Sequence, residues 1–308
     1  MIHIPSDAQW MPNAITVTGA RDEGAALHQL NHPYGLCVDD RDGTLFIADC
    51  WNHRIVAWKE GDTTTGRLVA GGNGKGSRLD QLNWPTDVLL DQENHSLIIA
   101  DWQNRRVMRW SLVSGTTQGH ILIDNIGCWG LAMDKEGHLY VTDIEKHEVR
   151  RYGRGDKVGT LVAGGHGQGD RLNQLNTPYY VFVDDEGAVY VSDWKNHRVM
   201  KWVKGATEGI VVAGGRGKGT DLTQLSRPQG VVVDDEGTVY VAEGENHRVT
   251  RWRKGAQKGE IIVGGNGRGQ GANQLSCPVG LSFDRHGRLY VADCENHRVQ
   301  RFDMVKSS

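Results

Sequence analysis

The chain has 308 residues and a formal net charge of −3, so it carries no strong electrostatic footprint for nucleic acid or for an acidic membrane surface. It contains 41 glycines, and ten tryptophans against four phenylalanines; the glycines recur at regular intervals, which argues for repeated tight turns and against disorder. The first residues, MIHIPSDAQWMPNA, show no signal peptide, no stretch reaches roughly 20 apolar residues, and the five cysteines form no CxxC pair. We therefore expect a cytoplasmic protein in a reducing compartment, without a membrane partner.

Six copies of one pattern run along the chain, and each begins with a short apolar strand. The first positions are Pro33, Pro85, Cys128, Pro178, Pro228 and Pro278, at spacings of 52, 43, 50, 50 and 50 residues. Each copy continues with a β-rich run that ends in an acid, a four-residue turn, a third strand such as RVMKW, and an outer apolar run such as IVVAGG. Four short strands bounded by Gly, Asp and Asn predict one propeller blade, and no run of good helix formers contradicts this.

The two ends of the chain complement each other. The last copy stops at RVQRFDMVKSS without an outer strand, whereas ITVTGARDEGAALHQL (15–30) matches IIVGGNGRGQGANQL (261–275). We therefore predict an all-β fold, a six-bladed β-propeller of four-stranded blades, in which strand 14–18 completes blade six and removes an exposed edge. Blades are expected to begin near residues 32, 84, 128, 177, 227 and 277, and residues 1–308 then form a single domain.

The string Asn-His-Arg-Val after a VYVxD strand, as in SDWKNHRVMKW (192–202), resembles the NHL-repeat family. The resemblance covers the chain from about Ile15 to Phe302 and rests on six phased copies of the proline, the acid and the Asn-His-Arg string. It implies a six-bladed β-propeller. It implies less about activity, because relatives include protein-binding modules, RNA-binding modules, sensor domains and a metal-dependent lyase.

The repeated motif is expected to hold turns in place, because a site that is needed once would not be built six times. The histidine lies four residues after the acid, so its imidazole can fold back and donate to that carboxylate or to the backbone. The following arginine can bridge to a neighbouring blade. Two blades depart from the pattern, with Arg105 in place of the histidine and Glu148 in place of the arginine. The acids are Asp49, Asp101, Asp143, Asp193, Glu243 and Asp293.

Three other patterns invite a functional reading that we do not adopt. Gly-rich strings such as GGNGKG (71–76) precede a strand rather than a helix, so we interpret them as crossovers and not as phosphate-binding loops. The histidines outside the motif show no HxH or HExxH spacing, so we assign no metal ligand and predict no cofactor, with a bound divalent metal ion as an alternative. Aromatic residues at the end of each third strand are expected to pack between sheets: Trp58, Trp110, Tyr152, Trp202, Trp252 and Phe302.

Function is expected where the repeats differ, in the loops around one mouth of the channel. Most blades have a glycine two residues after the first position, but Asp87 and Tyr180 stand there in blades two and four, and we expect both side chains to project into the channel mouth. Aromatic residues crowd the same loops, although Tyr34 and Tyr179 are expected to stack on their prolines as a floor. The predicted ligand-binding residues are Trp51, Trp84, Asp87, Trp102, Trp129, Glu145, Tyr180, Trp194 and Arg227.

The third crossover, ILIDNIGCWG (121–130), lacks the Gly-rich extension of the others. We therefore expect a lower rim there, with a notch beside Cys128 and Trp129.

Three functions fit this face. The first is a binding module for a protein segment or a small apolar or cationic ligand, with Asp87 and Glu145 supplying charge. The second is a propeller enzyme of the lyase or hydrolase type; its catalytic residues are unknown, with His32, Asp87, Cys128 and Cys277 as candidates, and no triad is recognisable. The third, RNA binding, is disfavoured because Lys and Arg are scarce in these loops. We rank binding first, do not expect nucleic acid as a partner, and expect a monomer.

Overall fold

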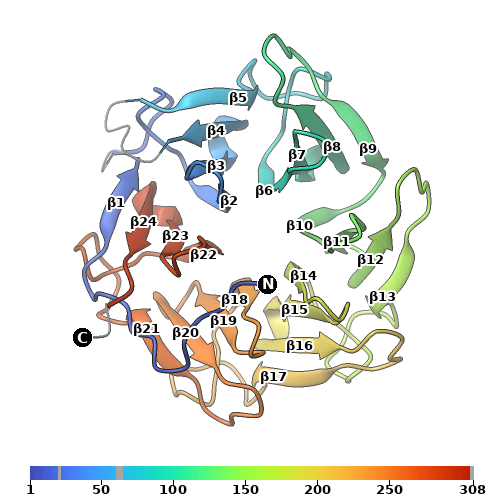
Figure 1. Ribbon diagram of the computed structural model, residues 1–308. Helices are drawn as coiled ribbons and strands as arrows, with labels where there is room; N and C mark the ends of the chain where they lie inside the picture. Colours follow the sequence, from blue (N-terminus) through green and yellow to red (C-terminus); the bar gives the residue numbers. More distant parts are fainter. Residues whose placement is uncertain (20–21, 60–64, 306–308) are drawn as a thin grey trace.

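The computed structural model describes residues 1–19, 22–59 and 65–305. Six four-stranded antiparallel sheets stand around a common axis, with the innermost strand of each sheet beside the channel (Figure 1). This arrangement confirms the all-β, six-bladed β-propeller predicted from the repeats. The helical elements of the described ranges are four 3-10 turns, and no helix there is long and apolar enough to span a membrane.

Each blade runs outward from its first strand to its fourth. Blade 1 comprises β2 (Pro33–Asp39), β3 (Thr44–Asp49), β4 (Arg54–Trp58) and β5 (Arg67–Gly71), and blade 2 comprises β6 (Pro85–Asp91), β7 (Ser96–Asp101), β8 (Arg106–Ser111) and β9 (His120–Asp124). Blade 3 comprises β10 (Cys128–Met133), β11 (Leu139–Asp143), β12 (Glu148–Tyr152) and β13 (Thr160–Gly164), and blade 4 comprises β14 (Pro178–Val183), β15 (Val189–Asp193), β16 (Arg198–Trp202) and β17 (Ile210–Gly214). Blade 5 comprises β18 (Pro228–Val233), β19 (Val239–Glu243), β20 (Arg248–Trp252) and β21 (Glu260–Gly264), and blade 6 comprises β22 (Pro278–Phe283), β23 (Leu289–Asp293), β24 (Arg298–Phe302) and β1 (Ile15–Thr18).

The ring closes through β1, as expected. This strand pairs antiparallel with β24, with Ile15 opposite Arg301 and Thr16 opposite Gln300. The Thr16 hydroxyl also donates to Oε1 of Gln300 at 2.8 Å. In Figure 1 the amino-terminal strand lies beside the carboxy-terminal one, so the sixth sheet has four strands and β24 is not left as an exposed edge.

The hydrophobic core lies between neighbouring blades, and the ring at the end of each third strand helps to fill it. Trp110 of blade 2, for example, belongs to one cluster with Phe46 and Ala48 of blade 1. All six predicted packing residues are buried, namely Trp58, Trp110, Tyr152, Trp202, Trp252 and Phe302. Large rings that bridge two sheets remove much apolar surface from water, which holds successive blades together.

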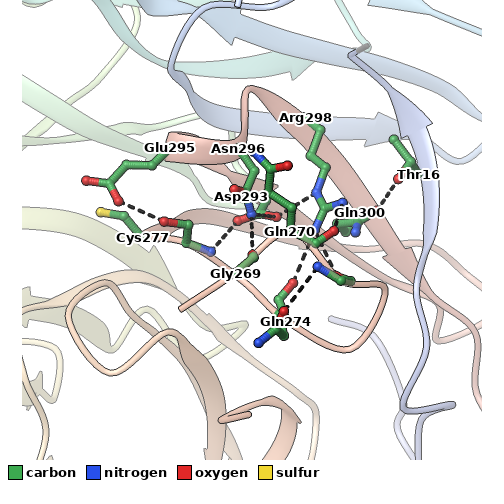
Figure 2. A network of polar contacts seen from close by, with 12 residues as sticks. Thr16, Gly269, Gln270, Gln274, Cys277, Asp293, Glu295, Asn296, Arg298 and Gln300 are labelled. Atoms are coloured by element: carbon green, nitrogen blue, oxygen red, sulfur yellow. Dashed lines mark hydrogen bonds and ion pairs between the residues drawn. The ribbon is translucent and has the colours of Figure 1, made fainter. Parts of the chain in front are cut away.

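Blade 6 illustrates how the repeated acid holds its loops (Figure 2). The buried carboxylate of Asp293 accepts a hydrogen bond from the Ser276 backbone N–H at 2.6 Å. It also accepts from the Asn296 side-chain amide at 2.8 Å and from Nε of Arg298 at 2.7 Å. The remaining guanidinium nitrogens donate to carbonyls of the crossover that enters the blade, at Gln270, Gly271 and Gln274. The arginine therefore pairs with the acid of its own blade and does not bridge to the next one.

Blade 3 lacks this arginine, and its network differs accordingly. Glu148 stands in the arginine position and pairs with Nε of Arg150 at 2.6 Å. Asp143 accepts the backbone N–H groups of Glu145 and Lys146 at 3.0 and 3.1 Å instead. The replacement of the arginine by Glu148 therefore changes the polar network of this blade.

The histidine of the motif links neighbouring blades, but as an acceptor rather than the expected donor. Nδ1 of His197 accepts the backbone N–H of Arg227 at 3.1 Å, and Nδ1 of His53 accepts that of Trp84 at 3.2 Å. The same bond recurs between His147 and Thr177, His247 and Cys277, and His297 and His32. Both partners have left-handed backbone, with φ of 53° at His197 and 49° at Arg227. This bond therefore fixes the residue before the first strand in five of the six blades.

Blade 2 shows what happens without the imidazole. Arg105 replaces the histidine, so no imidazole stands ready for the N–H of Gly127, the residue before the first strand of blade 3. Cys128, which occupies the proline position, donates its own N–H to the Ile126 carbonyl of the crossover at 2.8 Å. That crossover spans only residues 125–127, whereas the one from β5 to β6 spans 72–84. The missing histidine and the shortened crossover therefore occur together.

Candidate functional site

The loops that vary between repeats meet at one end of the propeller. Three 3-10 turns present tryptophans there: η1 (Cys50–Asn52), η2 (Trp102–Asn104) and η3 (Trp194–Asn196). Each turn is held against the crossover that precedes its own blade, as in the hydrogen bonds from Trp51 N–H to the Asn31 carbonyl and from Gln103 N–H to the Asn83 carbonyl, both 3.1 Å. The residue before each first strand and the residues after each acid are therefore neighbours.

Seven rings from these loops form a continuous row, which we call the aromatic arc. In order, its members are His32, Trp51, Trp84, Trp102, Trp129, Tyr179 and Trp194. The ring centroids of successive members are 3.9, 5.6, 5.8, 4.8, 4.1 and 4.7 Å apart. The structure thus brings together five of the predicted ligand-binding residues, across blades 1 to 4.

Members of the arc differ in how far they reach solvent. Trp51 is 42% exposed, and Trp84, Trp102 and Trp194 are half-buried. Trp129 is only 5% exposed and has Tyr34 beside it, with ring centroids 5.8 Å apart. These two rings form the floor. Tyr179, expected to belong to the floor, is instead stacked between Trp129 and Trp194 within the arc.

Charged residues continue the ring where the arc ends. The guanidinium of Arg227 lies 4.5 Å from the Trp194 ring centroid, and its Nη1 is 2.9 Å from Oε1 of Glu245. Glu245 also pairs with Lys218 at 2.7 Å, and Glu295 pairs with Arg268 at 3.1 Å. We call this group the ion-paired segment: Lys218, Arg227, Glu245, Arg268 and Glu295. Lys218 and Arg268 come from Gly-rich crossovers, which the sequence pattern marked only as connections.

Asp87 and Tyr180 lie below the arc. Both line a cavity of about 220 Å³ along the channel, but they are 6% and 5% exposed and so do not stand at an open mouth. The Asp87 carboxylate accepts the N–H groups of Val88 and Leu131 at 3.0 and 2.8 Å, and Tyr180 Oη donates to the Thr86 carbonyl at 3.2 Å. Burial raises the pKa of Asp87 to about 7. We expected Asp87 to supply charge to a ligand on the face, but its carboxyl group is buried below that face.

The four candidate catalytic residues make separate contacts. His32 is stacked on Trp51 as the first member of the arc, and burial together with nearby His297 lowers its pKa. Cys128 is fully buried, with its thiol 3.2 Å from the Arg106 carbonyl, and burial raises its pKa. Burial likewise raises the pKa of Cys277 to about 12. Neither thiol is therefore poised as a nucleophile, and neither contacts Asp87 or His32 in a triad.

Glu145 lies where the sequence predicts a notch. It is exposed and forms an ion pair with Nη1 of Arg105, whose Nη2 donates to Asn125 at 3.1 Å. Arg105 thus fills part of the space that the shortened crossover leaves beside Cys128. The carboxylate of Glu145 already has a partner in this structure.

The described residues bring three metal-ligating groups together in one place, and it is not on the arc. Asp134, Glu136 and His138 lie in the turn between β10 and β11, at the opposite end of the strands. His138 Nδ1 and the Asp134 carboxylate are 3.0 Å apart, as in an ordinary turn-stabilising hydrogen bond.

Comparison with known sequences identifies the repeat. The profile of the NHL repeat matches four segments, residues 30–58, 126–152, 225–252 and 275–302. A search of curated protein sequences gives no significant match.

Many solved structures share the fold at low sequence identity. An auxiliary nutrient binding protein from Bacteroides thetaiotaomicron has a TM-score of 0.73 and 16% identity, over 97% of this chain and 78% of that one. A gluconolactonase from Xanthomonas campestris has a TM-score of 0.65 and 15% identity, over 99% of both chains. The virginiamycin B lyase from Staphylococcus aureus has a TM-score of 0.55 and 12% identity, over 97% of this chain and 100% of that one. With its four matched repeats and its ring of six sheets, the chain is an NHL-repeat six-bladed β-propeller.

Proposed function

We propose that this propeller is a binding module whose aromatic arc takes an extended segment of a partner protein. The observation that carries the proposal is the unbroken row of rings from His32 to Trp194, which spans four blades. A long strip of rings offers stacking contacts to successive residues of an extended chain. Exposed tryptophan and tyrosine are also the usual anchors of protein interfaces.

The ring surfaces of the arc support one ligand class in particular. The indole N–H groups of Trp129 and Trp194 are buried, so these two donors are not available to a ligand on the face, and the arc offers mainly flat ring surface there. Aromatic-lined grooves of this kind bind proline-rich segments, because the preformed polyproline II helix packs its proline rings against flat side chains. We therefore expect a proline-containing segment, which also loses little conformational entropy on binding.

An enzyme remains the second reading, because the buried carboxyl group of Asp87 has its pKa raised to about 7 and could exchange a proton near neutral pH. Its position below Trp129 and beside Tyr180 separates it from the open face. The gluconolactonase and the lyase share only the fold at 15% and 12% identity, so they lend no catalytic residue to this chain.

The test is a titration with a deca-proline peptide, followed by intrinsic tryptophan fluorescence. We expect saturable binding to the intact protein, and at least about a tenfold loss of affinity in Trp102→Ala and in Trp194→Ala. Ile144→Ala is the matched control, because Ile144 follows the acid of blade 3 as Trp102 and Trp194 follow theirs, but carries no ring.

Two results would contradict the proposal. Equal affinities of all three variants would remove the arc from the binding site. Stoichiometric zinc or copper in the purified protein, with a chelator-sensitive activity, would favour the enzyme instead.

A further inference from the structure

The amino-terminal segment of the chain fills a groove between two blades. Trp10 is 5% exposed; its ring centroid lies 6.0 Å from that of Tyr240 in blade 5 and 5.8 Å from that of Phe283 in blade 6. Its indole N–H donates to the Gly287 carbonyl at 2.9 Å. Ile4 is buried in the same cluster. The segment therefore acts as a bound peptide whose tryptophan is the main anchor.

Polar contacts also hold this segment. Nη1 of Arg251 donates to the Ala8 carbonyl at 2.7 Å, and the N–H of Met11 donates to the Asp303 carbonyl at 2.8 Å. In Figure 1 the segment runs outward from the N label near the axis, across blades 5 and 6, towards β1. It passes the turns between first and second strands, at the opposite end of the blades from the aromatic arc.

Blades 3 and 4 form the equivalent groove, and in this structure it is open. The repeat period of 50 residues means that adding 100 to a number in blades 3 and 4 gives the equivalent position in blades 5 and 6. A cavity of about 460 Å³ lies between blades 3 and 4. Its lining includes Tyr140, Arg151, Gly187, Val189 and Trp202, the equivalents of Tyr240, Arg251, Gly287, Leu289 and Phe302.

Charge distinguishes the open groove from the filled one. In the filled groove Nε of Arg251 pairs with Glu260 at 2.6 Å. The equivalent of Glu260 is Thr160, so Arg151 lacks that carboxylate. The described lining residues of the open groove include Arg151, Lys204 and His166, but no acidic side chain. An acidic group on a ligand would therefore meet positive charge without displacing a partner from the lining.

Apolar surface is also exposed at the groove. Leu161 and Val203 line the cavity and are 40% and 58% exposed. Exposed aliphatic side chains around a cavity are typical of a surface that a partner covers.

We propose that the groove between blades 3 and 4 binds an extended segment of another protein that carries a tryptophan and a nearby acidic residue. The tryptophan enters beside Tyr140 and donates to the Gly187 carbonyl, as Trp10 does to Gly287. The acidic residue pairs with Arg151 or Lys204. This site is separate from the aromatic arc and does not depend on the function proposed for it.

The backbone contributes less here than in the filled groove. In blade 6 the N–H of Val305 donates to the Gln9 carbonyl at 2.7 Å, so the segment pairs with the end of the chain. In blade 4 the corresponding stretch turns back on itself, because the N–H of Ala206 donates to the Val203 carbonyl at 2.9 Å. Recognition therefore rests on side chains, and we expect a moderate affinity.

The experiment supplies the amino-terminal segment to the intact protein as a separate peptide. The probe is a fluorescein-labelled peptide of residues 2–12, IHIPSDAQWMP, and the readout is fluorescence anisotropy. The groove between blades 5 and 6 already holds its own copy, so added peptide reports on the open groove. We expect a dissociation constant of about 10–500 µM, and at least about a tenfold weaker one for the Trp10→Ala peptide.

Charge is tested by changing the peptide and the protein together. A Gln9→Glu peptide should bind several-fold more tightly than the natural sequence. Thr160→Glu in the protein, which copies Glu260, should remove that gain by pairing with Arg151. Thr117→Glu adds the same charge at an exposed threonine outside the groove lining, and should leave the gain in place.

Three results would overturn the proposal: no binding up to about 1 mM peptide, equal effects of Thr160→Glu and Thr117→Glu, or binding that is indifferent to Trp10→Ala. A fourth result, concentration-dependent dimerisation that Thr160→Glu abolishes, would overturn it in favour of a second copy of the chain as the occupant.

Discussion

The aromatic arc and the ion-paired segment occupy equivalent positions of the same repeat. The residue before the first strand is Trp84 in blade 2 and Arg227 in blade 5, and in both blades its N–H is held by the histidine of the preceding blade. The residue after the acid is Trp194 in blade 4 and Gly244 in blade 5. The repeat therefore decides where a side chain stands on the face, and the residue type alone decides which chemistry is presented there.

The two regions also differ in what they leave for a ligand. Each charge of the ion-paired segment already has a partner, so a ligand there must displace a protein contact and desolvate the freed group. Rings of the arc stack on one another edgewise or in parallel, yet keep part of their surface open to solvent. The arc is consequently the region where binding costs least.

Replacing the acid that ends the second strand of a blade should have the largest effect on stability. Because this acid belongs to the repeated motif, the change should destabilise the loops of both regions together. In Asp193→Ala the buried guanidinium of Arg198, now 2.7 Å from that carboxylate, loses its charged partner. We expect the free energy of unfolding to fall by about 3–5 kcal/mol, measured by urea unfolding.

Asp143→Ala in blade 3 is the matched comparison, because Asp143 accepts mainly backbone N–H groups and has no arginine partner. The expected loss there is about 1–2 kcal/mol. Similar losses in the two variants would show that the arginine adds nothing to the acid network.

Asp87 is buried below the arc, and its carboxyl group should make the free energy of unfolding depend on pH. Its folded-state pKa of about 7 lies above the ordinary value of 3.8, so the carboxyl group prefers to be protonated in the folded protein. Its contribution to stability is therefore full below about pH 4 and is lost as pH rises through 7, by up to about 4 kcal/mol.

The histidines that link the blades act in the opposite direction. Burial lowers the pKa of His53 and His197, so their contribution is present above pH 6.5 and declines as pH falls. The difference between the wild-type protein and Asp87→Asn isolates the carboxyl group, because asparagine resembles the protonated acid. Unfolding profiles with the same pH slope in both proteins would mean that Asp87 is charged in the folded state.

The fold could be predicted from sequence because its determinants are local and repeated. Pro178, Asp193 and the Asn-His-Arg string recur in phase, and the missing outer strand of blade 6 matched the unassigned strand near Ile15. The members of the arc could also be named, because they vary at fixed positions of that repeat. The sequence could not predict that these rings form an unbroken row, since contact between two rings depends on how far each side chain extends towards the next blade.

Other features were hidden because they depend on a neighbour in space. Asp87 stands where most blades have glycine, and a Cβ added at the glycine of blade 1, Gly35, would overlap with Asp87 itself. Whether such a side chain faces solvent or fills the channel depends on all six blades at once. The pairs Lys218–Glu245 and Arg268–Glu295 recur at the same two repeat positions, but those positions lie on different loops, and only the packing of the loops shows that they meet. The position of Trp10 between two blades likewise depends on a segment that lies outside the repeat.

Cutting the arc should affect binding rather than folding. Trp84→Ala removes the ring that lies between Trp51 and Trp102, at 5.6 and 5.8 Å from their centroids. We expect the affinity for the deca-proline peptide to fall about tenfold, which is about 1.4 kcal/mol. Glu295→Gln, in the ion-paired segment, should change that affinity by less than about twofold. A larger loss in Glu295→Gln than in Trp84→Ala would move the binding site to the other side of the face.

The smallest effect is expected at Arg227, the residue where the two regions meet. Its guanidinium covers the Trp194 ring at 4.5 Å and is 44% exposed, as is usual for a surface ion pair. Arg227→Gln should therefore lower the free energy of unfolding by less than about 1 kcal/mol, since neither an exposed pair nor an exposed cation–π contact is worth more. The same change uncovers one face of Trp194, so acrylamide should quench the intrinsic fluorescence more strongly than in the wild-type protein. Lys218→Gln, which keeps Arg227 on the ring, should leave quenching unchanged. If Arg227→Gln also leaves quenching unchanged, the guanidinium does not shield the Trp194 ring in solution, and the contact between the two regions is absent there.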